Sequence, residues 1–278
     1  MTQIKIPLRS VSQLNQYTRC PMSYKLARID KVWARPAAWL PQGTAFHTVA
    51  EIVEKARAEG REVPLERAKE IFGEEYAKDI GELSAITPNF DWWQGSGPYN
   101  AWRDIERRFW VGMEQVEKFY AWREMVGQEI WQTPATEDEP SKPAIELSFS
   151  IVIETPAGPI RLRGFIDAVV VLPDGSIRVR DYKTGNKPGD DFQLGVYALV
   201  IKLLYGVEVT TGDYFMAGKK GKKPTLTHPF DLSEWTLEAV AARFAEVEEG
   251  IRGENFEALP EPDKCNFCDV SYSCPAFN

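Results

Sequence analysis

Hydrophobic residues in the first half of the chain recur every three or four positions, which is the spacing of a buried helix face. The pattern predicts a helix over residues 10–30 that Cys20-Pro21 interrupts. A second helix is expected to begin at Thr44, a good capping residue, and to bury Phe46, Val49, Ile52 and Val53. Residues 62–131 keep a mostly helical pattern around one loop rich in proline and glycine.

The second half of the chain changes to alternating hydrophobic and polar residues, the pattern of strands with one buried face. Three long strands and two shorter ones are expected at 144–154, 160–172, 176–185, 212–218 and 224–230. A strongly apolar helix at 191–206 ends at Gly206. Asp231 and Glu234 resemble a capping box and predict a last helix at 233–252.

The order of these elements predicts an α/β protein with a central mixed sheet flanked by helices. We expect one domain with a helical part at about 10–132, a polar linker at 133–143, a core of sheet and helix at 144–249, and a tail at 250–278. Six of the nine tryptophans lie between Trp92 and Trp131. Because aromatic rings mostly supply buried area, we interpret these as packing residues and assign them no ligand.

Composition and charge narrow the class of protein. A chain of 278 residues is long enough for a substantial core. It has no apolar run of about 18 residues and no secretory signal at its start, so we expect a cytoplasmic protein without a membrane partner. The net charge of -8 argues against nonspecific coating of nucleic acid but allows a local basic groove. The loop at 218–223, GKKGKK, could contact phosphates, although such a run is more often a solvated loop tip.

Asp181 and Lys183 lie two apart on an expected strand, so their side chains project together. Alone, such a pair is an ordinary surface ion pair. Asp167 lies on the preceding strand, where a hairpin would bring it beside Asp181. Two neighbouring carboxylates repel, and a divalent cation is the usual remedy, with His47 available to complete the site. Mg²⁺ or Mn²⁺ beside a lysine is the chemistry of phosphodiester hydrolysis.

The cysteines have the number and spacing of a metal site. Cys265, Cys268 and Cys274 lie close together in the sequence, and Cys20 is the remaining cysteine. In a reducing compartment such residues are more often ligands than disulfides. Four thiolates suit either structural zinc or a [4Fe-4S] cluster, and the spacing leaves both open.

The segments GFIDAV, RDYKTG and QLGVYAL resemble motifs of the RecB-like branch of the PD-(D/E)XK nuclease superfamily, which includes the CRISPR-adaptation exonucleases and phage-encoded relatives. The resemblance implies a restriction-endonuclease-like core with a helical insert. It also implies a metal site formed by His47, Asp167, Asp181 and the backbone carbonyl of Tyr182, with Lys183 as the catalytic lysine.

Three further residues enter through this resemblance. Gln193 and Tyr197 share a helix face and match a Q-x-x-x-Y motif that supports the lysine and the DNA. Glu146 occupies the place of an acidic residue with a less direct role. From its strand pattern alone, Glu146 is equally well an exposed residue on a polar face.

The segments YTRCPMSYKL and CNFCDVSYSCP match family members with one cysteine before the nuclease motifs and three after them. The resemblance therefore implies a structural [4Fe-4S] cluster that joins the N- and C-terminal ends. Structural zinc is the alternative. The ligands in either case would be Cys20, Cys265, Cys268 and Cys274.

Together these features imply an Mg- or Mn-dependent DNA exonuclease that acts on single strands or DNA ends. Its setting would be recombination, repair, replication, or CRISPR or phage DNA processing. Because the chain lacks a G-x-x-x-x-G-K-[ST] motif, a helicase or recombination partner would be a separate chain. The alternative is a noncatalytic iron-sulfur subunit that binds DNA or serves as a scaffold, against which the intact catalytic residues argue.

Overall fold

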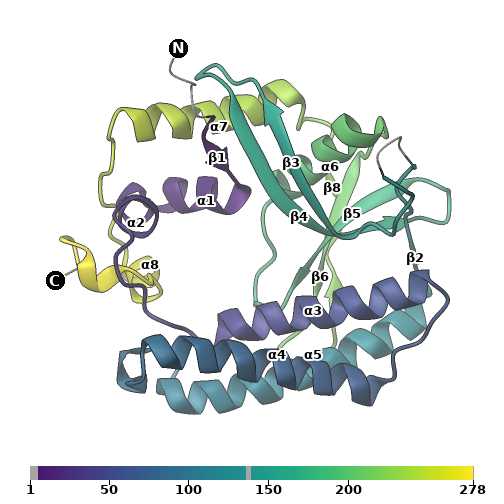
Figure 1. The fold of residues 1–278 in the computed structure, drawn as a ribbon, viewed down its shortest axis with the longest axis horizontal. Helices are drawn as coiled ribbons and strands as arrows, with labels where there is room; N and C mark the ends of the chain where they lie inside the picture. The colour runs from purple at the N-terminus through teal and green to yellow at the C-terminus, as the bar shows by residue number, and fades with distance from the viewer. Residues whose placement is uncertain (1–5, 136–138, 278) are drawn as a thin grey trace. The chain divides into compact units, whose positions relative to one another are not determined.

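The computed structural model describes residues 6–135 and 139–277, which form two compact units (Figure 1). The first unit comprises the described residues up to 36, residues 148–164, and those from 235 onward. The second unit comprises residues 37–147 and 165–234. Each unit therefore depends on stretches that are distant in the sequence. Within the described ranges, no helix is long and apolar enough to cross a membrane.

The N-terminal part of the first unit is helical and contains the expected interruption. It comprises α1 (Val11–Arg19), α2 (Pro21–Tyr24) and a π-helical turn (Lys25–Ile29). The Ser10 hydroxyl accepts the Gln13 N–H and caps α1. Cys20 ends α1 in an extended conformation, and Pro21 begins α2, where a proline costs no hydrogen bond.

The rest of the first unit comes from the last part of the chain and from the first half of a long strand. Its elements are α7 (Leu237–Arg252), α8 (Pro262–Asn266), a 3₁₀ turn (Ser271–Ser273) and β1 (Leu8–Arg9), which pairs in parallel with the start of β4 (Ile160–Val171). The helices α1 and α7 approach closely: a methyl group added to Gly250 would lie 2.1 Å from the Tyr17 hydroxyl. The Tyr17 hydroxyl donates to the Asn255 carbonyl at 2.7 Å.

The predicted capping box of the last helix is wrong. The helix α7 begins at Leu237, because the Thr236 hydroxyl accepts the Ala239 N–H. Asp231 instead accepts the N–H of Ser233 in a local turn. A threonine cap three residues before a free N–H satisfies the helix end as well as the expected acidic cap would.

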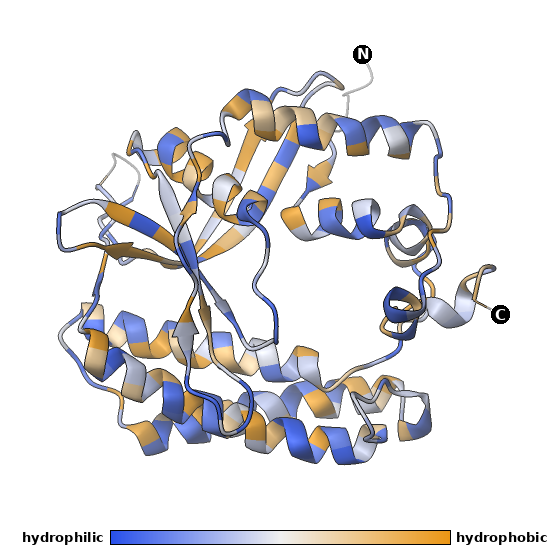
Figure 2. Cartoon of the chain, turned by 180° about the vertical axis from the view of Figure 1, so that it is seen from behind, coloured by the Kyte–Doolittle hydropathy of each residue, from blue (hydrophilic) through white to orange (hydrophobic). Residues whose placement is uncertain are grey.

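In the second unit, three long helices pack together: α3 (Trp39–Ala58), α4 (Leu65–Ile86) and α5 (Ala101–Val126) (Figure 1). The expected start of α3 at Thr44 is wrong, since the helix already begins at Trp39. Pro41 lies in the first turn, where its missing N–H has no helical partner. The Thr44 hydroxyl donates to the Leu40 carbonyl inside the helix and caps nothing. Outer faces of these helices alternate between hydrophilic and hydrophobic stripes (Figure 2).

The mixed sheet predicted from the sequence is present. Its strands in the second unit include parts of β3 (Ile145–Ile153) and β4, followed by β5 (Ile177–Lys183), β6 (Thr211–Met216), β7 (Thr225–Leu226) and β8 (Phe230–Asp231). Strands β4 and β5 are antiparallel, β5 and β6 parallel, and β6 and β7 antiparallel. A short strand, β2 (Glu129–Ile130), also pairs with β4 and was not predicted.

The sheet of the second unit separates two helical layers. Tyr182 and Phe215 belong to the hydrophobic core that α3, α4 and α5 share with the sheet. On the opposite face, Gly212 lies against Leu194 of α6 (Asp191–Tyr205). As predicted, α6 ends at Gly206, which adopts a left-handed conformation. Successive residues of β5 therefore face different layers, as strand geometry requires.

The interpretation of the tryptophans as packing residues holds for some of them. Trp93 and Trp122 are buried, at 3% and 5% exposure. It is wrong for three others, which are more than half exposed: Trp92, Trp102 and Trp110. The predicted linker at 133–143 is closed by a bridge between Gln132 and Pro143, and residues 136–138 lie outside the described residues.

Candidate functional site

The site lies where β4 and β5 part. Their antiparallel register runs from the turn as far as the pair Ala168 and Arg180. One residue farther, the Asp167 carboxylate accepts the Tyr182 N–H at 2.7 Å, so a side chain continues the contact between the two strands. This places Asp167 and Asp181 on adjacent strands, as the hairpin predicted.

Three potential metal ligands from separate elements converge here. The His47 Nδ1 on α3 lies 3.2 Å from Glu146 Oε1 on β3 and 3.5 Å from Asp167 Oδ2 on β4. One ligand atom from each of the three residues lies within 4.8 Å of the others. An imidazole and two carboxylates are donors that Mg²⁺ or Mn²⁺ accepts.

Glu146 has an unusual backbone conformation for a strand residue. Its φ is 44°, in the left-handed region, while Ile145 and Leu147 on either side are buried in β3. Such a conformation costs a residue with a side chain about 1–3 kcal/mol and is retained where the surroundings fix it. The strained residue is the one whose carboxylate contacts His47, so Glu146 is more than an exposed residue on a polar face.

A second group of polar side chains surrounds Asp181. Lys183 Nζ lies 2.7 Å from Asp181 Oδ2, and the Gln193 amide donates to Asp181 Oδ1 at 2.7 Å. The same amide nitrogen lies 2.7 Å from the Tyr197 hydroxyl, and Lys183 Nζ donates to Gln193 Oε1 at 3.3 Å. The structure thus brings Gln193 to both the aspartate and the lysine, and Tyr197 to Gln193.

One oxygen in this group has no hydrogen bond. Asp181 is 2% exposed, and its Oδ2 has no hydrogen-bond partner within the described residues, although the Lys183 ammonium lies 2.7 Å away as an ion-pair partner. The charge of that ammonium offsets the cost of burying the oxygen. The donor set that fits a divalent cation on its own chemistry is that of His47, Glu146 and Asp167.

In the absence of a cation, the pKa values of His47 and Asp167 are both raised, so the site holds protons that the free side chains would release. Burial, with the charge of Asp181, raises the pKa of Asp167 to about 8. Burial alone would lower the pKa of His47, but the charges of Asp167 and Glu146 raise it to about 9. If the imidazole keeps the proton, the carboxylate stays ionised, so the two shifts describe one proton shared by one cluster. A divalent cation would displace that proton.

The site opens into a cavity of about 440 Å³ beside α3. Besides His47 and Glu146, it is lined by residues that the sequence analysis did not assign to the site, including Thr44, Thr48 and Glu51. Thr44 and Glu51 lie three and four positions from His47 on one helix face, and this spacing was the signal available in the sequence. The predicted role of the Tyr182 carbonyl stays a prediction, since the contact found here uses the Tyr182 N–H.

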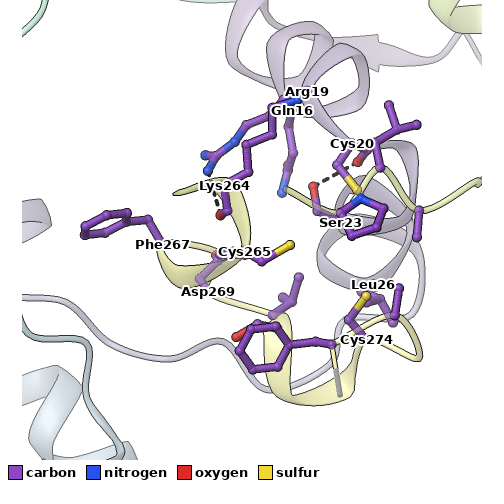
Figure 3. A pocket seen from close by; sticks show the side chains of 18 of the residues that line it. Gln16, Arg19, Cys20, Ser23, Leu26, Lys264, Cys265, Phe267, Asp269 and Cys274 are labelled. Atoms are coloured by element: carbon purple, nitrogen blue, oxygen red, sulfur yellow. Dashed lines mark hydrogen bonds between the residues drawn. The ribbon is translucent and has the colours of Figure 1, made fainter. Parts of the chain in front are cut away.

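The four cysteines are all in the first unit and line one cavity of about 360 Å³. Figure 3 shows the sulfur atoms of Cys20, Cys265 and Cys274 directed toward this cavity. Among the described residues, however, no three cysteine sulfurs lie within 4.8 Å of one another. The expected four-cysteine cluster that joins the chain ends is therefore not shown by the structure. The cysteines share a cavity without forming a tight group.

The chain is similar to two phage proteins and aligns with one solved structure. The chain is 66% identical over 291 residues to the Gene 69 protein of Mycobacterium phage L5, with 99% of each chain covered. It is 64% identical over 278 residues to the Gene 69 protein of Mycobacterium phage D29, with 100% of each covered. A solved protein, SSO0001, aligns over 86% of this chain and 96% of its own at 13% identity, and its TM-score of 0.36 is too low to support an argument.

A family model provides the assignment. The model described as the PD-(D/E)XK nuclease superfamily matches residues 9–275, which include both the site around Asp167 and the cysteines. Nucleases of this kind use divalent metals, and the group of His47, Glu146 and Asp167 could bind one. The chain belongs to the PD-(D/E)XK nuclease superfamily.

Proposed function

We propose that the protein is an Mg²⁺- or Mn²⁺-dependent DNA exonuclease of the RecB-like branch. The observation that carries this proposal is the convergence of His47, Glu146 and Asp167, one ligand atom of each lying within 4.8 Å of the others. These residues would hold the cation. When bound, a divalent cation polarises a phosphoryl oxygen and lowers the pKa of a bound water.

Lys183 is the side chain best suited to act on the phosphate. Its ammonium is held by Asp181 and by Gln193 Oε1, yet 30% of the side chain is exposed. Because an ammonium has three donors and the hydrogen bond to Gln193 uses one, donors remain for a phosphate oxygen or an attacking water. Gln193 donates to the Asp181 carboxylate and also contacts the Tyr197 hydroxyl, so the charge pair is oriented before substrate arrives.

The preference for single strands or ends rests on the resemblance of GFIDAV, RDYKTG and QLGVYAL to the RecB-like motifs. The similarity to two mycobacteriophage proteins supports a setting in phage DNA metabolism for the proposed activity. A role in CRISPR processing rests on the same resemblance, and a separate helicase or recombination partner follows from the lack of a nucleotide-hydrolase motif in the sequence.

Degradation of end-labelled DNA tests the proposed function. We expect the wild-type protein to shorten single-stranded DNA in the presence of Mg²⁺ or Mn²⁺ and to stop in EDTA. Lys183→Ala should lower the rate at saturating DNA by about 10²–10³-fold. Lys202→Ala is the control, because Lys202 is an exposed residue near the end of α6, in the same unit, and is ion-paired with Glu208. Equal rates for Lys183→Ala and wild type would favour the noncatalytic DNA-binding subunit.

We further propose a [4Fe-4S] cluster in the cavity of the first unit. The four lining cysteines, the cavity of about 360 Å³ and the resemblance support it. A single tetrahedral zinc with bonds of about 2.3 Å needs sulfurs about 3.8 Å apart. The match of the cysteine spacing to family members with one cysteine before and three after the nuclease motifs supports the cluster over zinc. Burial raises the pKa of the Cys268 thiol, which a bound iron would offset.

Anaerobic purification distinguishes these two cofactors. The cluster predicts brown protein with broad absorbance near ~400 nm and about four irons per chain. Cys274→Ser should lose that absorbance, whereas a serine-to-alanine change at exposed Ser233, outside the cavity, should retain it. A colourless wild-type protein with one zinc would overturn the cluster proposal and leave the nuclease proposal intact.

A further inference from the structure

The loop that joins β6 to β7 carries four exposed lysines: Lys219, Lys220, Lys222 and Lys223. It is strongly hydrophilic (Figure 2). Across residues 6–135 and 139–277, none of the four forms an ion pair. Other lysines of the same unit are paired with carboxylates: Lys69, Lys78, Lys142 and Lys202. The loop therefore concentrates uncompensated positive charge on a chain whose net charge is -8.

The helix α5 holds the backbone of this loop in place. The Gln115 amide donates to the Gly218 carbonyl at 2.9 Å, and Lys118 Nζ donates to the Lys219 carbonyl at 2.7 Å. Glu114 accepts the Gly221 N–H at 2.6 Å. Burial opposes ionisation of Glu114, but Lys118, the Gly221 N–H and the charge of Lys220 outweigh it and lower its pKa. Three side chains of one helix segment thus fix the loop backbone, and among the described residues none of them forms a close ion pair with a loop lysine.

The loop begins beside the proposed catalytic lysine. Strands β5 and β6 are parallel, and their register pairs Lys183 with Met216. One residue farther, the Ala217 N–H donates to the Lys183 carbonyl at 2.9 Å. Gln115 also donates to the Thr184 carbonyl at 3.0 Å, so one amide fixes the start of the loops that follow both strands. Ligands of open α/β sheets commonly bind at these carboxyl ends of parallel strands.

We propose that residues 218–223 form a preorganised surface for the phosphate backbone of the nucleic-acid strand that enters the site. This inference rests on the proposed function, because it names how the same site holds its substrate. The lysines would contact phosphates and not bases, so the surface gives affinity and register without sequence preference.

Two observations favour this role over that of a solvated loop tip. A solvated tip needs no support, whereas this loop has three hydrogen bonds from α5 and closes on itself through the Lys222 N–H and the Lys219 carbonyl. Ordering a free loop on binding would cost about 1–2 kcal/mol per residue, and an anchored loop avoids that cost. The lysines also lack the carboxylate partners that neutralise lysines elsewhere in this unit.

Salt dependence of DNA binding tests the proposal. Affinity for a labelled single-stranded oligonucleotide is measured by anisotropy in EDTA for wild type and for the fourfold variant Lys219→Gln, Lys220→Gln, Lys222→Gln and Lys223→Gln. Each lost phosphate contact lowers the slope of log K against log salt by about 0.7. If all four lysines contact phosphates, wild-type affinity falls about 50-fold more than the variant's between about 50 and about 200 mM salt.

The matched control removes the same charge from the paired lysines: Lys69→Gln, Lys78→Gln, Lys142→Gln and Lys202→Gln. It should keep the wild-type slope, and a fourfold Lys→Arg loop variant should keep it as well. If the fourfold Lys→Gln variant does not fold, the four single variants provide the same slopes one contact at a time.

Equal slopes for the loop variant and wild type would overturn the loop proposal while leaving the nuclease proposal standing, provided that wild type degrades DNA. Equal reductions in the loop variant and the control would also overturn it, since net charge alone would then explain the loss. A wild-type protein that neither binds nor degrades DNA would overturn both proposals.

Discussion

Replacing Asp167 by asparagine should stabilise the protein when no metal is present and abolish its stabilisation by metal. Asp167 is 6% exposed and lies within a cluster that includes two other carboxylates. An asparagine keeps an oxygen for the Tyr182 N–H, which Asp167 accepts at 2.7 Å. The substitution removes the charge and keeps the size of the side chain. The change in stability therefore reports the cost of burying the charged carboxylate, without a change in packing.

The magnitude follows from the pKa of Asp167, which is raised from 3.8 to about 8. The folded state therefore binds a proton that the unfolded state releases, and the contribution of this group to stability is lost as pH rises from about 4 to about 8. The part of this shift that is expressed at pH 7 corresponds to about 4 kcal/mol. Because His47 shares the proton and loses a favourable charge in the variant, we expect a gain of roughly 1–3 kcal/mol.

Urea denaturation followed by tryptophan fluorescence measures this difference in EDTA at pH 5 and pH 8. The stability gained by Asp167→Asn should be larger at pH 8 than at pH 5, because the destabilising effect of the raised Asp167 pKa grows as the pH rises from the unfolded pKa toward the folded one. Saturating Mn²⁺, at about 100 times its dissociation constant, should stabilise wild type by about 2.7 kcal/mol and leave Asp167→Asn unchanged.

Asp213→Asn is the matched control, because Asp213 is also a buried aspartate of the sheet. It is paired with Arg180 at 2.6 Å, and breaking such a pair costs about 3–5 kcal/mol. The two identical substitutions should therefore change stability in opposite directions. If Asp167→Asn destabilises the protein in EDTA at pH 8, Asp167 is a structural residue and the reasoning about the metal site is wrong.

Three further predictions concern the same unit. Mn²⁺ affinity should rise about tenfold per pH unit for each proton that binding releases, as the pH approaches the His47 pKa of about 9. Calorimetry in buffers of different ionisation enthalpy would detect the released protons. An affinity that does not change with pH would contradict the prediction. Gly112→Ala should destabilise by about 1–3 kcal/mol in urea, because the added methyl lies 2.0 Å from the Phe72 ring; a neutral change would mean that the helices relax. Gln115→Ala should speed amide hydrogen exchange in both loops that Gln115 holds, the one that begins at Thr184 and the one that begins at Gly218. Faster exchange in only one of these loops would refute the idea that Gln115 anchors both.

The proximity of Asp167 to Asp181 and Lys183 could be predicted because these residues lie on regular strands, whereas the roles of Gln193, Tyr197 and Glu146 entered only through the resemblance. Alternation along β5 separates Asp181 from Tyr182, and the hairpin aligns Asp167 beside it. Gly206 ends α6 because the left-handed conformation there favours glycine. These features depend on local geometry that a sequence expresses directly.

Other features depend on interactions that a local pattern does not contain. The start of α3 at Trp39 was missed because Pro41, normally a helix breaker, is tolerated in the first turn. Strand β2 has two residues, too few for a periodic pattern. The left-handed backbone of Glu146 could not be predicted either, because it is fixed by the surrounding structure and costs energy locally.

The discontinuity of the first unit has a consequence for the order of folding. The cavity of the four cysteines combines residues near Cys20 with residues near Cys274, so it cannot close until almost the whole chain has left the ribosome. Bringing such distant segments together costs about 5 kcal/mol in loop entropy. Residues 37–147 supply the three long helices and are synthesised earlier. Loading of a cofactor by these cysteines would therefore be a late, post-synthetic step, and a chain shortened before α8 would lose it entirely.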